Sequence, residues 1–264
     1  MAIIVGDIHG NVEKVQVFLG YKPDVLHVAL GDYVDSFAES PNRQAECLRL
    51  LLESKAVLLW GNHDIGYLKH PPFYCTGFQE KEYLRYQVLI ELHKKRFLAA
   101  YAVDGWLCTH AGAHEGLVTT TDIYALAEKL NSDLAETLRS TRVLPPDNLF
   151  GVGRGRGGVS KHGGIFWYDF KREDGLATNI NQIFGHTEIR EPIVEKTYVA
   201  LDTTNCDHTC YLFDTETNKI VKLKLPLRTI RSEMNLDDEN IIVAGKVTLE
   251  MIEECRAGLK ILKN

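Results

Sequence analysis

Five short stretches of the sequence combine glycine with aspartate, asparagine or histidine, residue types that supply oxygen and imidazole donors to metal ions. Because they contain no thiolate, this donor set suits manganese, iron or zinc better than calcium or a structural zinc site. An aspartate can bridge two cations through its two oxygens, so the set can serve a pair of ions that meets a phosphate. The stretches lie at positions 6–10 (GDIHG), 31–35 (GDYVD), 61–64 (GNHD), 109–112 (THAG) and 184–187 (FGHT).

Each stretch follows a short apolar segment that predicts a β-strand. The first part of the chain alternates strands at 2–5, 25–30 and 56–60 with helices at 11–19, 43–53 and 79–95. Repeated βα units predict an α/β core with a mainly parallel sheet. The carboxyl ends of parallel strands meet at one edge of a sheet, so side chains far apart in the sequence can converge there.

The remainder of the chain predicts a more irregular part. Further strands are expected at 97–103, 106–109, 182–184 and 198–201, a helix at 121–139, and an antiparallel pair at 210–213 and 220–223 that forms a second sheet segment. Residues 151–164 are rich in glycine and basic residues, which predicts a loop. We expect one domain over 1–230 and a C-terminal extension over 231–264, with a helix at 248–262, packed on the same domain.

A single stretch of this kind is more often a capped turn than a site, but five in the same register form a strong pattern. The order Asp-x-His, Gly-Asp-x-x-Asp, Gly-Asn-His-Asp, Thr-His-Ala-Gly, Gly-His-Thr resembles calcineurin-like metallophosphoesterases. It is most similar to their phosphoprotein-phosphatase and bacterial diadenosine-tetraphosphatase branch, over about residues 3–225. The resemblance implies a four-layer αββα sandwich in which two mixed sheets face each other.

The resemblance also implies a role for each polar residue of the five stretches. His63 is left without a metal and is expected to protonate the leaving oxygen, while Asp35 orients it, because an imidazole titrates near neutrality and a carboxylate stabilises its charged form. The implied mechanism is attack by a metal-bridging hydroxide without a covalent phosphoenzyme. The implied metal ligands are Asp7 and His9 on the first ion, Asp32 as the bridge, and Asn62, His110 and His186 on the second.

The chain departs from the family pattern at positions 36 and 37, where Ser36 and Phe37 replace the usual Arg-Gly. Because arginine binds phosphate oxygens with a planar fork, we expect a replacement from elsewhere. Arg154 and Arg156 in the glycine-rich loop are the candidates, and Arg43 and Arg142 are weaker alternatives. Three other predictions are a structural role for Asp202 in a strand that closes the second sheet, and surface or loop positions for His114 and His162.

The main functional hypothesis is a phosphomonoesterase, with phosphoserine or phosphothreonine among its substrates, that uses two divalent ions. Manganese is the expected metal, and the same donors accept iron, zinc, cobalt or nickel. A dinucleoside polyphosphate hydrolase or nucleotide phosphodiesterase is the alternative, because the metal site alone does not separate these reactions. A non-catalytic interaction scaffold is the second alternative.

Composition and charge also limit the kinds of binding partner that we expect. The net charge of −6 provides no basic surface for bulk nucleic acid. The N-terminal residues show neither a long apolar run nor a basic start, so we expect a cytoplasmic protein without a membrane anchor. The six cysteines are too sparse for a disulfide framework, and Cys206 and Cys210 beside His208 are expected to be free thiols near a turn.

Overall fold

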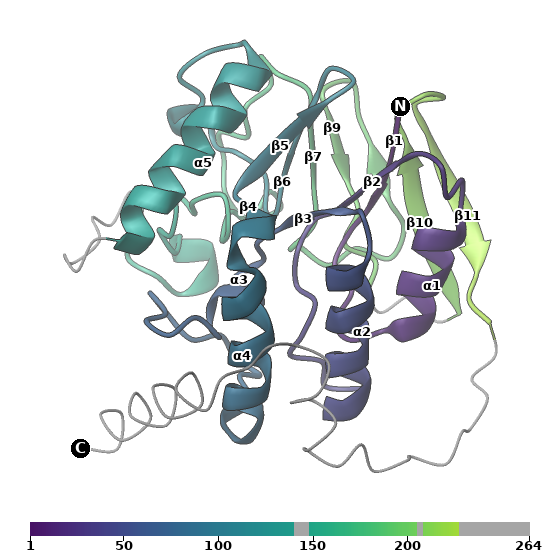
Figure 1. Ribbon diagram of the computed structural model, residues 1–264. Helices are drawn as coiled ribbons and strands as arrows, with labels where there is room; N and C mark the ends of the chain where they lie inside the picture. The colour runs from purple at the N-terminus through teal and green to yellow at the C-terminus, as the bar shows by residue number, and fades with distance from the viewer. Residues whose placement is uncertain (140–147, 205–207, 227–264) are drawn as a thin grey trace, which may run out of the picture.

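The computed structural model describes residues 1–139, 148–204 and 208–226, which form two β-sheets with helices beside them (Figure 1). The predicted α/β class and the two mixed sheets are confirmed. The predicted C-terminal extension and its helix at 248–262 lie outside the described residues. No helix in the described part of the chain combines the length and the apolar character needed to cross a bilayer.

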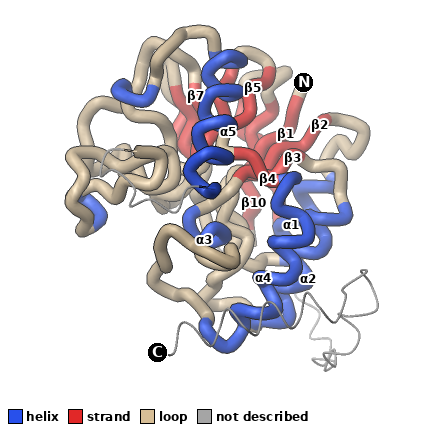
Figure 2. Tube along the Cα trace, turned by 60° about the vertical axis from the view of Figure 1, so that its left-hand side comes forward, coloured by secondary structure: helices blue, strands red, loops and turns tan. Residues whose placement is uncertain are grey.

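The first sheet has six strands and carries three of the five polar stretches. Its order is β11 (Lys219–Lys224), β10 (Thr209–Asp214), β1 (Ala2–Val5), β2 (Leu26–Ala29), β3 (Val57–Leu59) and β4 (Phe97–Leu98). Strands β1 to β4 are parallel, while β10 pairs antiparallel with both β1 and β11. Helices α1 (Val12–Gly20), α2 (Pro41–Glu53) and α4 (Tyr83–His93) lie together beside this sheet (Figure 2).

The second sheet has five strands and carries the other two stretches. Its order is β5 (Ala100–Val103), β6 (Trp106–Thr109), β7 (Gln182–Phe184), β9 (Tyr198–Ala200) and β8 (Ile193–Val194). The central strands β6, β7 and β9 are parallel, and the edge strands β5 and β8 are antiparallel to their neighbours. Helix α5 (Ile123–Arg139) packs against β5 and β6.

Two sequence predictions about the sheets are wrong. The strand expected at 97–103 ends at Leu98 and restarts at Ala100, so that β4 joins the first sheet and β5 the second. Asn131 of α5 holds this crossing point, because its Oδ1 accepts the N–H groups of both Ala99 and Ala100. The antiparallel pair near the end of the described chain extends the first sheet through β1 and does not form a second sheet segment.

Alternation of side chains along the strands explains why the sheets stack. In β1, Ala2 and Ile4 face the layer between the sheets, whereas Ile3 and Val5 belong to the core that includes the helices. Apolar side chains of the second sheet fill the same inter-sheet layer, with Ile183 of β7 among them. Burial of this layer holds the ends of β1, β2, β3, β6 and β7 in a fixed relation, and these are the strands that precede the polar stretches.

The local signals at the helix starts agree with this arrangement. Ser40 caps α2 by accepting the N–H of Arg43, and Pro41 occupies the first turn, so the helix begins two residues before the predicted boundary. Asn11 caps α1 in the same way, at 2.8 Å from the Lys14 nitrogen. Both helices therefore begin directly after the loops that carry Asp7 and Asp35.

Candidate active site and metal centre

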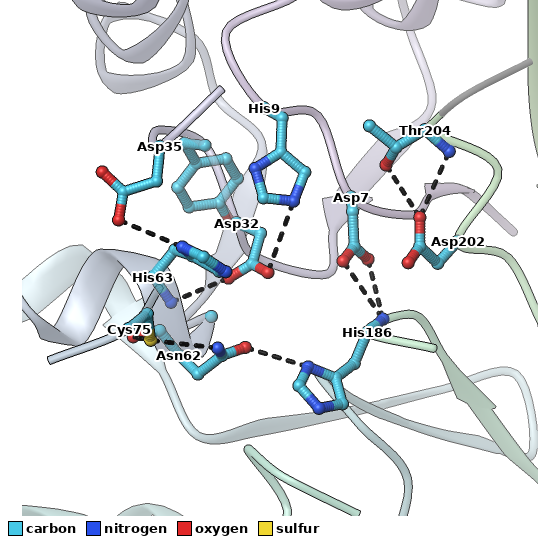
Figure 3. A network of polar contacts seen from close by, with 12 residues as sticks. Asp7, His9, Asp32, Asp35, Asn62, His63, Cys75, His186, Asp202 and Thr204 are labelled. Carbon is cyan, nitrogen blue, oxygen red and sulfur yellow. Dashed lines mark hydrogen bonds and ion pairs between the residues drawn. The ribbon is translucent and has the colours of Figure 1, made fainter. Parts of the chain in front are cut away.

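Five loops meet around a cavity of about 1050 Å³. They follow β1, β2 and β3 of the first sheet and β6 and β7 of the second, and Figure 3 shows labelled side chains from four of them pointing toward one another. His110, which follows β6, is fully buried and joins the others through a contact with Asn62. The predicted site residues that line the cavity are Asp7, His9, Asp32, Asp35, Asn62, His63, Arg156 and His186.

Three donor atoms from three loops lie within hydrogen-bonding distance of one another. Oδ1 of Asn62 is 2.8 Å from Nε2 of His110 and 2.9 Å from Nδ1 of His186. The two imidazole nitrogens are 3.2 Å apart. Asp32 lies beside them, with Oδ2 at 3.5 Å from Nε2 of His110. The structure thus brings together the bridge and the three ligands predicted for the second ion.

The hydrogen bonds around these donors show that they fit a cation. Nδ1 of His110 donates to the Leu30 carbonyl oxygen at 2.9 Å, which leaves a lone pair on Nε2. Nδ2 of Asn62 donates to the Cys75 sulfur at 3.1 Å, so the Asn62 carbonyl oxygen faces that lone pair. Two acceptors in contact repel each other unless positive charge lies near both. A divalent ion with nitrogen and oxygen ligands satisfies this donor set.

Asp32 faces the predicted ligands of both ions with the same carboxylate oxygen. Oδ2 is 3.6 Å from Nε2 of His9 and 3.5 Å from Nε2 of His110, whereas Oδ1 accepts the His63 N–H at 3.0 Å. The geometry therefore differs from a bridge that offers one oxygen to each ion. Burial by itself raises the pKa of Asp32, but the imidazoles around it, with that of His110 first, lower it overall, so the carboxylate stays charged.

The residues predicted for the first ion are arranged less tightly. Nδ1 of His9 lies 2.8 Å from the Val34 carbonyl oxygen, which leaves Nε2 facing Asp32. Both oxygens of Asp7 accept the His186 N–H, at 3.0 and 3.1 Å. Burial raises the pKa of Asp7, and the carboxylates of Asp202 and Asp32 raise it further. A cation next to Asp7 offsets this repulsion, so its predicted ligand role is compatible with the structure.

Four of the predicted site residues have the left-handed backbone conformation that side chains other than glycine rarely adopt. Their φ angles are 44° for His9, 53° for Asp32, 62° for Asp35 and 65° for His186. Each such residue costs about 1–3 kcal/mol and persists only where its surroundings enforce it, which is common at functional sites.

Two glycines of the polar stretches allow the backbone to approach the carboxylates. A Cβ atom on Gly61 would lie 2.1 Å from Oδ1 of Asp32, and one on Gly185 would lie 2.0 Å from Oδ1 of Asp7. These contacts are too short for any side chain, so glycine is required at both positions. The same carboxylates accept backbone N–H groups from residues just after these glycines: Asp32 accepts that of His63, and Asp7 accepts that of His186.

His63 and Asp35 form the predicted pair. Nδ1 of His63 lies 3.0 Å from Oδ2 of Asp35, whose side chain is fully buried. Burial lowers the pKa of His63, but Asp32 and Asp35 outweigh it and raise the pKa to about 9. The rings of His63 and His9 meet edge to face with centroids 5.1 Å apart. Together with Asp32, these two histidines form a second close group of donors.

The sequence matches a family model of calcineurin-like phosphoesterases over residues 2–190. The chain belongs to this family. It is accordingly a metal-dependent phosphoric ester hydrolase, and the phosphorylated substrates expected from the sequence agree with the family. Among curated proteins, none matches the sequence.

The solved structures that the chain is similar to match it at low sequence identity. A protein serine/threonine phosphatase from Saccharomyces cerevisiae is 15% identical with a TM-score of 0.48, over 87% of this chain and 81% of that one. A hypothetical protein from Pyrococcus horikoshii OT3 is 15% identical with a TM-score of 0.42, over 96% and 97% of the two chains. The phosphopantetheinyl hydrolase of Mycobacterium tuberculosis is 14% identical with a TM-score of 0.31, over 76% and 87%.

The candidate site contains three supporting residues that the sequence analysis missed. The buried carboxylate of Asp64 accepts three backbone N–H groups, those of Asp32, Tyr33 and Gly61, at 2.8 to 3.0 Å. Cys75 bonds to both the side chain and the carbonyl oxygen of Asn62, and Tyr67 donates to Asp35. Asp64 could have been found as the last residue of the Gly-Asn-His-Asp stretch, whereas Cys75 and Tyr67 belong to no motif.

The candidate arginines differ in whether they line the cavity. Arg156 lines the cavity, where its Nε lies 3.0 Å from Asp169 and its guanidinium donates to Oγ1 of Thr187 at 2.9 Å. Arg154 is exposed and is not among the described residues that line the cavity. Arg43 is paired with Glu13 of α1 and with Glu39, which lies just before α2. Arg142 lies outside the described residues.

Other predicted residues take positions beside the site. Asp202 lines the cavity and accepts both donors of Thr204, and its carboxylate raises the pKa of Asp7. The rings of His114 and His162 stack on each other at 3.8 Å, away from the described cavity lining. Cys47, Cys75, Cys108 and Cys210 are free, buried thiols, and Cys206 lies outside the described residues.

Proposed function

We propose that this phosphoesterase hydrolyses phosphomonoesters, with phosphoserine and phosphothreonine among its substrates, and that it uses two divalent ions, preferably manganese. The observation that carries the proposal is the His63–Asp35 pair, because His63 lies within one group of close donors with His9 and Asp32, and both members of the pair line the cavity. A pair of this kind is what protonation of a poor leaving group requires. A protein that served only as a scaffold would not need it.

The proposed ligands divide into two sets that share Asp32. Bound divalent ions lower the pKa of coordinated water and neutralise phosphate charge. Hydrogen bonds to the Val34 and Leu30 carbonyl oxygens hold His9 and His110 in the tautomer that presents Nε2 to an ion. The first set is Asp7, His9 and Asp32, and the second is Asp32, Asn62, His110 and His186.

Two side chains act directly on the substrate in this proposal, and a third supports one of them. His63 donates a proton to the leaving oxygen while Asp35 stabilises the charged imidazole. Arg156 binds phosphate oxygens, with Asp169 and Thr187 limiting its movement. It replaces the arginine that the family usually carries at the position of Ser36. Trp167 also lines the cavity, where its indole meets the ring of His186 edge to face with centroids 5.8 Å apart.

The test is hydrolysis of p-nitrophenyl phosphate and of bis(p-nitrophenyl) phosphate by metal-free protein to which manganese is added. We expect monoester turnover that disappears in Asp32→Ala. On phenyl phosphate, which has a poorer leaving group, His63→Ala should reduce turnover by about 100-fold or more. His93→Ala, which changes a histidine at the end of α4, is the matched control and should retain full activity. Absence of metal-dependent turnover on any ester would favour the scaffold hypothesis.

One feature favours the dinucleoside polyphosphate hydrolase as the second candidate. Phe37 lines the cavity, yet 85% of its surface is exposed, so its ring is available to stack on a base. Selective turnover of diadenosine tetraphosphate over both monoesters would establish this alternative. Loss of that selectivity in Phe37→Ala, with unchanged monoester turnover, would identify the ring as its cause.

A further inference from the structure

The carboxylate that holds His63 is itself held by a tyrosine. Oδ2 of Asp35 bonds to His63, and Oδ1 accepts a hydrogen bond from the hydroxyl of Tyr67. We propose that Tyr67 is the third member of a Tyr67–Asp35–His63 relay, in which it acts as a positioning residue for proton donation to the leaving group. This inference rests on the proposed function of His63. Tyr67 makes no described contact with a metal donor and lies outside the described lining of the cavity.

The direction of the Tyr67 hydroxyl hydrogen follows from its second partner. The backbone N–H of Gln79 donates to the Tyr67 oxygen at 2.9 Å, so this oxygen is an acceptor toward Gln79. Its own hydrogen is therefore available to Asp35, which as a carboxylate can only accept. Burial raises the pKa of Tyr67, and the charge of Asp35 raises it further, so the hydroxyl keeps its hydrogen. The Tyr67 hydroxyl and the Nδ1–H of His63 therefore both donate to Asp35, one to each carboxylate oxygen.

Aromatic packing fixes the Tyr67 ring in this orientation. The ring is fully buried, stacks on Phe78 with centroids 4.8 Å apart, and meets Tyr86 edge to face at 5.0 Å. A hydroxyl on a clamped ring cannot follow Asp35 if that carboxylate moves. The packing therefore turns the Tyr67 hydrogen bond into a positional restraint on Asp35.

This restraint also sets the orientation of the His63 imidazole. Asp35 has φ of 62° and a fully buried side chain, with one oxygen bonded to His63 and the other to Tyr67. Removing the tyrosine hydroxyl leaves a buried carboxylate oxygen without a described partner, which is costly enough to turn the carboxylate. A turned carboxylate no longer aligns with Nδ1 of His63, so the imidazole loses the orientation that points its other nitrogen toward the leaving oxygen.

The test compares Tyr67→Phe with wild type on two monoesters in the manganese-loaded enzyme. Phenyl phosphate needs a proton on its leaving oxygen, whereas p-nitrophenyl phosphate has a stable leaving anion and needs little help. We expect kcat on phenyl phosphate to fall about tenfold, the size expected for one lost hydrogen bond to a charged group, with KM unchanged. On p-nitrophenyl phosphate the loss should be less than about twofold, and the manganese content should stay at the wild-type value.

Two further variants separate the relay from a general effect on folding. Tyr86→Phe removes another hydroxyl of the same aromatic cluster, one that bonds to the Pro41 carbonyl oxygen, and should leave both substrates unaffected. Adding Tyr67→Phe to His63→Ala should cause no further loss, because Tyr67 acts only through His63. Thermal unfolding of each variant reports whether the fold is kept.

Three outcomes would overturn the relay. These are an equal loss on both esters, no loss on either, and a further tenfold loss in the His63→Ala background. A wild type that turns over neither monoester would instead refute the proposed function, and the relay with it. If the wild type is active and His63→Ala shows the leaving-group dependence while Tyr67→Phe does not, only the relay is refuted.

Discussion

The two proposed ion positions differ in how completely their donors are assembled. Around Asn62, His110 and His186, three donor atoms from both sheets lie within 3.2 Å of one another. Around His9, one imidazole faces the shared Asp32, while the Asp7 carboxylate is bonded to the His186 N–H. Preorganised ligands bind more tightly because less rearrangement is needed on binding. We therefore expect the ion held by His110 to bind first and more tightly.

The largest effect is expected from Gly61→Ala. This change displaces Asp32, the residue that both ion positions share, so it should affect both positions equally. The new methyl group would lie 2.1 Å from Oδ1 and 2.2 Å from the backbone nitrogen of Asp32. Asp32 must move, so both ions should be lost, together with activity and about 2 kcal/mol or more of the free energy of unfolding. Manganese binding by equilibrium dialysis and thermal unfolding measure the two effects.

The matched control for this change is Gly20→Ala. Gly20 ends α1, and a Cβ atom there meets no other atom within 4 Å. Its variant should bind both ions normally and unfold within about 0.5 kcal/mol of wild type. If Gly61→Ala binds two manganese ions as wild type does, the close approach at Asp32 is not required for the metal centre.

A smaller but more informative effect separates the two positions. His110→Ala should weaken binding of the tighter manganese ion by at least about 100-fold. The variant removes a buried ligand, and this loss is larger than the loss caused by removing a residue that only supports a ligand. His9→Ala should leave the tighter ion within about threefold of wild type and abolish only the weaker one. Manganese titration followed by electron paramagnetic resonance distinguishes free from bound ions. Equal weakening of one ion by both variants would contradict the difference between the positions.

The sequence was informative where a site residue follows a regular element. Asp7, Asp32 and Asn62 each lie just after a short apolar strand and next to glycine, so their common edge followed from the βα alternation. Tyr67 and Cys75 lie between β3 and α4, in a segment without hydrophobic periodicity, and their contacts depend on how that segment folds back over the site.

The same limit explains the errors in the sheets. Nothing in the pattern at 97–103 marks the change of sheet at Ala99, because that change depends on Asn131, 32 residues away. The strands β10 and β11 pair with each other as the sequence predicts, but their place beside β1 is set by apolar side chains such as Phe213 that fill the layer between the sheets. Long-range packing of this kind leaves no local signal.

The smallest effect tests whether Cys75 contributes to the tighter position. Its sulfur accepts Nδ2–H of Asn62 at 3.1 Å, which keeps the carbonyl oxygen of the amide toward His110. Cys75→Val removes this acceptor and lets the amide turn its NH₂ group toward the ion. We expect the tighter manganese ion to bind about tenfold more weakly, as for other residues that orient a ligand.

Two variants decide the cause of that loss. Cys75→Ser keeps an acceptor and should restore most of the affinity, whereas Cys210→Val changes another buried thiol, on β10, and should have no effect on metal binding. If Cys75→Val binds the tighter ion as wild type does, the hydrogen bond to the sulfur does not orient Asn62. The packing of Asn62 against His110 and His186 would then be sufficient, and the difference between the two positions would come from the histidines alone.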